Sequence, residues 1–71
     1  MIADIEWVAP IGQHRSSEYL FRRCLSESGT RMVELYDDGG WIHRRYYAKA
    51  EGTEAQIEEL RELFELNFNM R

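Results

Sequence analysis

Two histidines, one cysteine and four serines are the side chains that could perform nucleophilic or acid–base chemistry. Nucleophilic catalysis needs a nucleophile, a base beside it and a group that orients the base. No nucleophile elbow, glycine-rich phosphate loop or nucleotide-binding fingerprint surrounds any of these residues. The sequence therefore predicts a protein that is not an enzyme, with a Cys24–His43 dyad as the weaker interpretation. The residues concerned are His14, His43, Cys24, Ser16, Ser17, Ser26 and Ser28.

Metal ligands are equally sparse. Zinc sites use cysteine and histidine at short, regular spacings, whereas His14, Cys24 and His43 are widely separated and no Cys-x-x-Cys occurs. Asp37-Asp38-Gly39 matches part of a calcium loop, but the other ligand positions are missing. We predict no metal site and no cofactor, and a plain turn at residues 37–39.

Arginine and aromatic side chains form the first candidate binding surface. Two Arg-Arg pairs occur, and eight of the nine basic residues are arginine, whose planar fork suits carboxylate and phosphate groups. Arginine, tyrosine and tryptophan also dominate the energetics of protein interfaces. The alternative is that the rings complete a thin core beneath the arginines. The candidates for protein binding are Arg22, Arg23, Tyr36, Trp41, His43, Arg44, Arg45, Tyr46 and Tyr47.

Acidic side chains form the second candidate surface. Residues 50–71 hold six acids against two bases, whereas residues 14–49 hold seven bases against five acids. An acidic ridge could meet a basic partner, although a simple solvated helix surface also explains it. The acidic candidates are Glu54, Glu58, Glu62 and Glu65, with Glu51 and Glu59 beside them. A third candidate is the apolar chain end, residues 66–71, which a homodimer would bury.

Composition limits what can position these side chains. A chain of 71 residues with 44% hydrophobic residues and a net charge of −4 predicts one small globular domain, residues 1–71. A single cysteine cannot form an internal disulfide, and no apolar run is long enough to cross a membrane. The lone thiol and the absence of a signal-peptide pattern predict a cytoplasmic location.

Hydrophobic periodicity then predicts the elements. Alternation through Ile5, Trp7 and Ala9 indicates a strand over residues 2–9. The turn sequence Asp37-Asp38-Gly39-Gly40 predicts a hairpin that joins strands over residues 30–36 and 41–47. Gly52-Thr53 ends the last strand, and Thr53 with Gln56 predicts a capping box. The apolar stripe of the helix that follows consists of Ile57, Leu60, Phe64 and Phe68, with Leu63 beside it.

Residues 18–25 fit two structures. As a strand, Tyr19, Phe21 and Leu25 would share a face, and as a helix the stripe would contain Leu20, Phe21, Cys24 and Leu25. Gly29 suits either a hairpin loop or a helix end. We favour the strand. The predicted fold is α+β, an antiparallel meander of three to four strands packed by one C-terminal amphipathic helix. The alternative is β-α-β-β-α with a helix at 17–27.

These features favour a non-enzymatic protein-interaction module, an inhibitor or adaptor that binds a larger protein or protein–nucleic-acid complex. In size and pattern it resembles the compact inhibitors that phages and other mobile elements encode against host defence enzymes. The alternative is nucleic-acid binding through the strands, since a sheet followed by a helix resembles small DNA-binding domains in element order. That alternative is weakened by the acidic net charge, and its phosphate contacts would be Arg22, Arg23, Arg31, Arg44 and Arg45.

Overall fold

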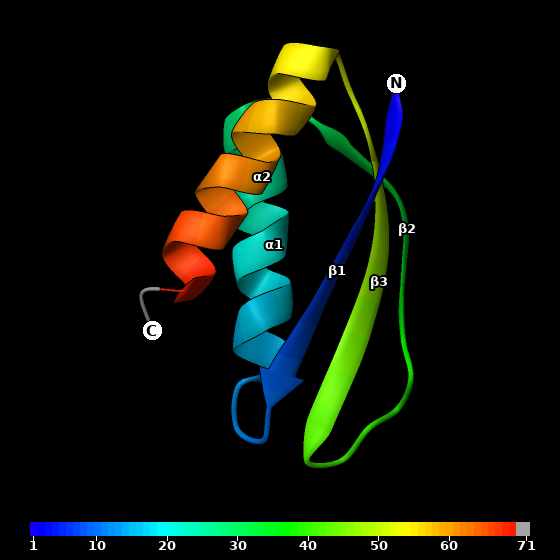
Figure 1. The fold of residues 1–71 in the computed structure, drawn as a ribbon, viewed down its shortest axis with the longest axis vertical. Coiled ribbons are helices and arrows are strands. Elements are labelled where there is room, and N and C mark those ends of the chain that lie inside the picture. Colours follow the sequence, from blue (N-terminus) through cyan, green and yellow to red (C-terminus); the bar gives the residue numbers. More distant parts are fainter. Residues whose placement is uncertain (70–71) are drawn as a thin grey trace.

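The computed structural model describes residues 1–69, which form three strands and two helices. Both helices lie on one face of the sheet, and the other face is uncovered (Figure 1). The α+β prediction with an antiparallel sheet and a packed C-terminal helix is confirmed, whereas Met70 and Arg71 lie outside the described residues. The elements are β1 (Ile2–Pro10), α1 (His14–Ser28), β2 (Arg31–Asp37), β3 (His43–Glu51) and α2 (Glu54–Asn69).

The strand order explains why the chain needs a helix after β1. The order is β1-β3-β2, and both outer strands pair antiparallel with β3, so the predicted meander, in which consecutive strands are neighbours, is wrong. β1 and β2 therefore run in the same direction with β3 between them. A connection between strands that run in the same direction needs a crossover of a dozen or more residues, usually a helix. Residues 11–30 supply that crossover.

The favoured strand over residues 18–25 is wrong, and the helical alternative is confirmed with wider bounds, His14–Ser28. A strand would have split the neighbouring pair Leu20 and Phe21 between two faces, whereas the helix buries both on one stripe. Gly29 ends the helix in the left-handed region, with φ of 75°. The Thr30 N–H then donates to the Leu25 carbonyl at 3.0 Å, which satisfies a helix-end acceptor.

An aromatic cluster lies at the centre of the core between the sheet and the two helices. The Trp7 ring stacks on Tyr46 from the neighbouring strand, with centroids 4.9 Å apart. Phe21 of α1 and Phe64 of α2 each lie 4.8 Å from the Trp7 ring. Small side chains complete the same face of the sheet around this cluster. These are Ala3, Ala9, Ala48 and Ala50, all of them buried.

Local hydrogen bonds fix the start of α2 as the sequence predicts. The Gln56 N–H donates to the Thr53 hydroxyl at 3.1 Å, and the Thr53 N–H donates to the Gln56 side-chain oxygen at 2.9 Å. This reciprocal pair is a capping box. Neither described helix is long and apolar enough to cross a membrane.

The hairpin turn between β2 and β3 is also confirmed. The Asp38 carboxylate accepts the N–H groups of Gly40 at 2.9 Å and Arg45 at 3.1 Å. These two hydrogen bonds hold the pKa of Asp38 below its ordinary value, with the Gly40 N–H as the larger cause. The residues that resemble a calcium loop in the sequence therefore use their carboxylates to close a turn.

Candidate binding surfaces

Three of the five candidate nucleophiles, Cys24, Ser17 and Ser28, are buried within the fold, whereas Ser16 and Ser26 are exposed on α1. Cys24 is 1% exposed, and burial raises the pKa of its thiol. The buried hydroxyl of Ser17 donates to the His14 carbonyl at 2.8 Å, and that of Ser28 donates to the Leu25 carbonyl at 3.2 Å. His43 lies on the opposite face of the sheet from Cys24. Within residues 1–69, no three His, Cys, Asp or Glu side chains are grouped so that they could hold a metal ion.

The arginine set is dispersed over the molecule. Arg22 and Arg23 are exposed on α1 rather than on a strand, so phosphate binding by this pair through a strand is wrong. Arg44 points to the helix side of β3, where its Nε donates to the Gly40 carbonyl at 2.9 Å and lies 3.8 Å from Asp37.

The remaining strand arginines also differ from each other in their surroundings. Arg31 forms an ion pair with Glu51, which lowers the pKa of that glutamate. Arg45 is exposed on the uncovered face, as alternation along β3 predicts. No single face therefore gathers the five arginines expected to contact phosphate.

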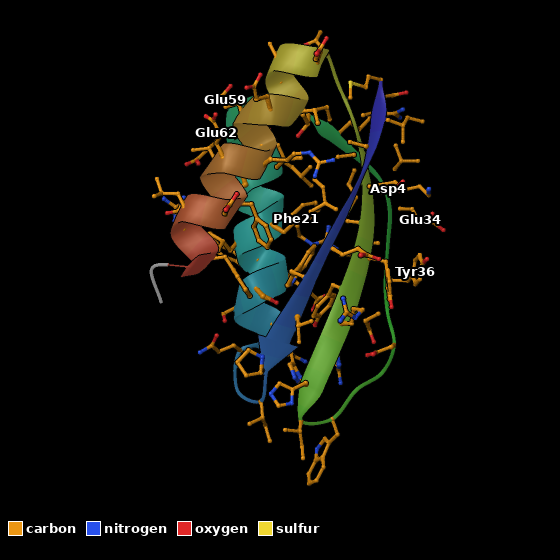
Figure 2. The ribbon with its side chains drawn as sticks, in the orientation of Figure 1. Asp4, Phe21, Glu34, Tyr36, Glu59 and Glu62 are labelled. Atoms are coloured by element: carbon orange, nitrogen blue, oxygen red, sulfur yellow. The ribbon has the colours of Figure 1, made fainter. Side chains whose placement is uncertain are left out.

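The uncovered face of the sheet, hereafter the open face, combines two tyrosines with mixed charges. Tyr36 and Tyr47 are register partners whose rings stack with centroids 5.1 Å apart. A hollow of about 310 Å³ lies beside this pair. Figure 2 shows Tyr36, Glu34 and Asp4 on the side of the sheet away from the helices. The face consists of Asp4, Glu6 and Val8 of β1, Glu34 and Tyr36 of β2, and Arg45, Tyr47 and Lys49 of β3.

The open face carries charges of both signs, and one ion pair joins two of them. The Lys49 ammonium lies 2.9 Å from the Asp4 carboxylate, which raises the pKa of Lys49. Tyr46, predicted as a surface contact, points the other way and is fully buried. Its hydroxyl donates to the His14 carbonyl at 3.2 Å, and burial raises its pKa. Tyr46 therefore contributes to the core rather than to a binding surface.

One end of the sheet carries exposed apolar side chains. Pro10 and His43 are register partners, so the loops that follow β1 and precede β3 leave the sheet at the same end. Trp41 is 78% exposed, Ile11 is 58% exposed and Ile42 is 53% exposed. We call these three residues the apolar end. Sequence reasoning identified Trp41 but not the isoleucines, because only the strand register shows that the two loops lie at the same end of the sheet.

The acidic residues of α2 occupy its exposed side as predicted. Glu54, Glu58, Glu62 and Glu65 are all exposed, and so is Glu59. Figure 2 shows Glu59 and Glu62 on the side of α2 away from the sheet. Leu66 is 60% exposed on the same helix, which fits the prediction of an exposed apolar residue near the chain end.

A second hollow lies between β1 and α2, and sequence reasoning missed it. It has a volume of about 370 Å³ and is lined by residues 5–8 of β1. Since consecutive strand residues point to opposite faces, a hollow that touches all four lies against the edge of the strand. We call it the edge groove. Its α2 lining consists of Arg61, Phe64, Glu65 and Phe68.

These features define a small two-layer α+β domain with several exposed candidate surfaces and with Cys24 buried in its core. Comparison with protein-family models, with curated proteins and with solved structures finds no match to this chain.

Proposed function

We propose that this protein is a non-enzymatic interaction module that binds a larger protein through its apolar end, as an inhibitor or adaptor in the cytoplasm. The observation that carries the proposal is the exposure of Trp41, Ile11 and Ile42 together at one end of the sheet. Tryptophan is the residue type most enriched among interface hot spots. The adjoining open face supplies the stacked Tyr36–Tyr47 pair as a further contact area.

The positions of the polar groups also support this proposal over catalysis. Cys24 has a raised pKa and is buried, so the reactive thiolate is disfavoured. Nucleic-acid binding is the second candidate function, favoured only by the tyrosine pair beside Arg45 on the open face. The ion pairs of Arg31 and Arg44 reduce the positive charge that phosphate contacts need.

The test is affinity capture from host extract with matched surface variants. We expect a protein that is retained by the wild-type domain and by Tyr19→Ala but lost on Trp41→Ala. Tyr19 is a suitable control because it is an equally exposed aromatic residue, 70% exposed, on α1. Loss of a hot-spot tryptophan should weaken the affinity by about 30-fold or more, since truncation costs about 2 kcal/mol or more.

Two results would argue against the proposal. Equal retention of the protein by Trp41→Ala would mean that the apolar end is not the anchor. Retention that disappears after nuclease treatment, together with salt-sensitive binding of labelled DNA or RNA by the purified domain, would favour the nucleic-acid alternative.

A further inference from the structure

The free edge of β1 is a second surface, separate from the apolar end. β1 is an outer strand of the sheet and has a strand neighbour only on its β3 side within the described chain. An unpaired strand edge presents backbone N–H and C=O groups that can accept an added strand. The edge groove lies directly against this edge over residues 5–8.

Two hydrogen bonds show which residues of β1 face outward. The Met1 carbonyl accepts the Gly52 N–H, next to the β3 ladder, at 3.0 Å. The Asp4 carbonyl instead accepts Arg61 of α2 at 3.1 Å. In an antiparallel pair, the N–H and C=O of one residue point to the same side, and the side alternates along the strand. Glu6 and Val8 therefore direct their backbone groups outward, towards the groove side.

The groove combines an aromatic wall with two carboxylates. The Phe64 and Phe68 rings stack with centroids 5.3 Å apart. Glu6 is exposed on the open side of the edge, and Glu65 is exposed on α2. Neither carboxylate has an ion-pair partner among the side chains that the structure describes. Arg61, the basic residue of the lining, is directed to the Asp4 carbonyl.

β1 contains no arginine or lysine, so a second copy of the strand cannot place a basic side chain opposite Glu6 in any register. An antiparallel pairing of two β1 edges centred on Ile5 would set Asp4 opposite Glu6, and one centred on Glu6 would set Glu6 opposite itself. Like charges directly opposite each other destabilise a strand pair. An added strand with a basic side chain opposite Glu6 would instead pair opposite charges on the open face, and the next residue of that strand, on the helix side, would lie along the phenylalanine rings.

We propose that the β1 edge and the edge groove bind an extended, arginine- or lysine-bearing segment of a partner protein, which adds to the sheet as a fourth strand. The backbone groups of Glu6 and Val8 pair with the segment. One basic side chain of the segment lies opposite Glu6. The residue next to this basic residue in the segment points to the helix side, where it contacts Phe64 and Phe68 beside Glu65. The site is independent of Trp41 and of the partner bound by the apolar end.

The probe is a short synthetic peptide that alternates arginine and valine, with blocked termini. Binding is followed by the fluorescence of Trp7, which lines the groove, in a Trp41→Phe background where it is the remaining tryptophan. We expect saturable binding that shifts the Trp7 emission. A peptide with glutamate in place of arginine should not bind. A peptide N-methylated at alternate residues cannot pair with the strand edge, so its affinity should be lower by about tenfold or more.

Matched charge reversals locate the site on the protein. Glu6→Arg with Glu65→Arg should weaken binding about tenfold. Glu59→Arg with Glu62→Arg changes the net charge equally on the outer side of α2 (Figure 2) and should change binding less than about twofold.

Three results would overturn the proposal. If both double variants weakened peptide binding equally, the peptide would be held by non-specific electrostatic attraction rather than at the edge groove. Undiminished binding of the N-methylated peptide would exclude strand addition. If the domain sedimented as a dimer and the peptide dissociated that dimer, the edge would be assigned to a second copy of the chain. Unchanged circular dichroism of each variant ensures that the comparison concerns folded protein.

Discussion

Replacement of Phe21 by leucine tests the aromatic cluster on which the two-layer fold depends. Phe21 is fully buried, and its ring lies 4.8 Å from Trp7 and 5.3 Å from Phe64. Figure 2 shows it between the helices and the sheet. Each aromatic pair contributes about 0.5–1.5 kcal/mol beyond its buried area. Loss of two pairs, with the smaller volume of leucine, should lower the free energy of unfolding by about 2 kcal/mol.

That loss is large for this domain. A chain of 71 residues has a free energy of unfolding of about 4–11 kcal/mol. At about 4–8 °C per kcal/mol, Phe21→Leu should lower Tm by about 8–16 °C. Urea unfolding followed by circular dichroism, combined with calorimetry, measures both quantities.

Phe68→Leu is the matched control, because Phe68 is only partly buried and contacts a single ring, that of Phe64, in the described cluster. It should cost less than about 1 kcal/mol. Equal destabilisation by the two variants would refute the central position of Phe21. It would also contradict the helical structure of residues 14–28, since only the helix places this ring between Trp7 and Phe64.

Three further predictions concern single groups. Thr53→Ala removes the capping hydroxyl of α2 and should lower the free energy of unfolding by about 1 kcal/mol, as thermal unfolding would show; no change would mean that the box is not formed in solution. The lowered pKa of Asp38 means that its hydrogen bonds to Gly40 and Arg45 stabilise the fold above the ordinary aspartate pKa, and that this stability is lost as the pH falls through the lowered value. Asp38→Asn should therefore flatten the decline of stability below about pH 4 in urea titrations at several pH values; an unchanged decline contradicts this. Cys24 should react with a thiol reagent at the rate of unfolding rather than at the rate of an exposed thiol, because it is buried; rapid labelling of the folded domain would contradict the core assignment.

Period-two alternation in β1, the aspartate–glycine turn and the capping box are sufficient to predict four of the five described elements, β1, β2, β3 and α2. Each of these signals is local, since it depends on residues within a few positions of one another. Local signals do not predict the first helix, because the apolar residues Leu20, Phe21, Cys24 and Leu25 suit either a strand or a helix periodicity. Its structure follows from the strand order, because β1 and β2 run in the same direction and need a long crossover.

The candidate surfaces also combine features that local rules predict with features that depend on tertiary packing. Alternation along a strand suffices to place Arg44 and Arg45 on opposite faces of β3, because that rule is local. The sequence could not show that Tyr46 is buried while Tyr47 lies on the open face, since that depends on which face the helices cover.

Local patterns in the sequence predict a small α+β domain with an acidic, amphipathic C-terminal helix, and they include no motif for catalysis or metal binding. Packing between the elements determines that both helices cover the same face of the sheet, that the loops carrying Ile11 and Trp41 leave it at the same end, and that the outer edge of β1 lies beside α2. The physical reason is that periodicity fixes which residues of an element share a face. The partner of each face is fixed by contacts between elements that are distant in the sequence.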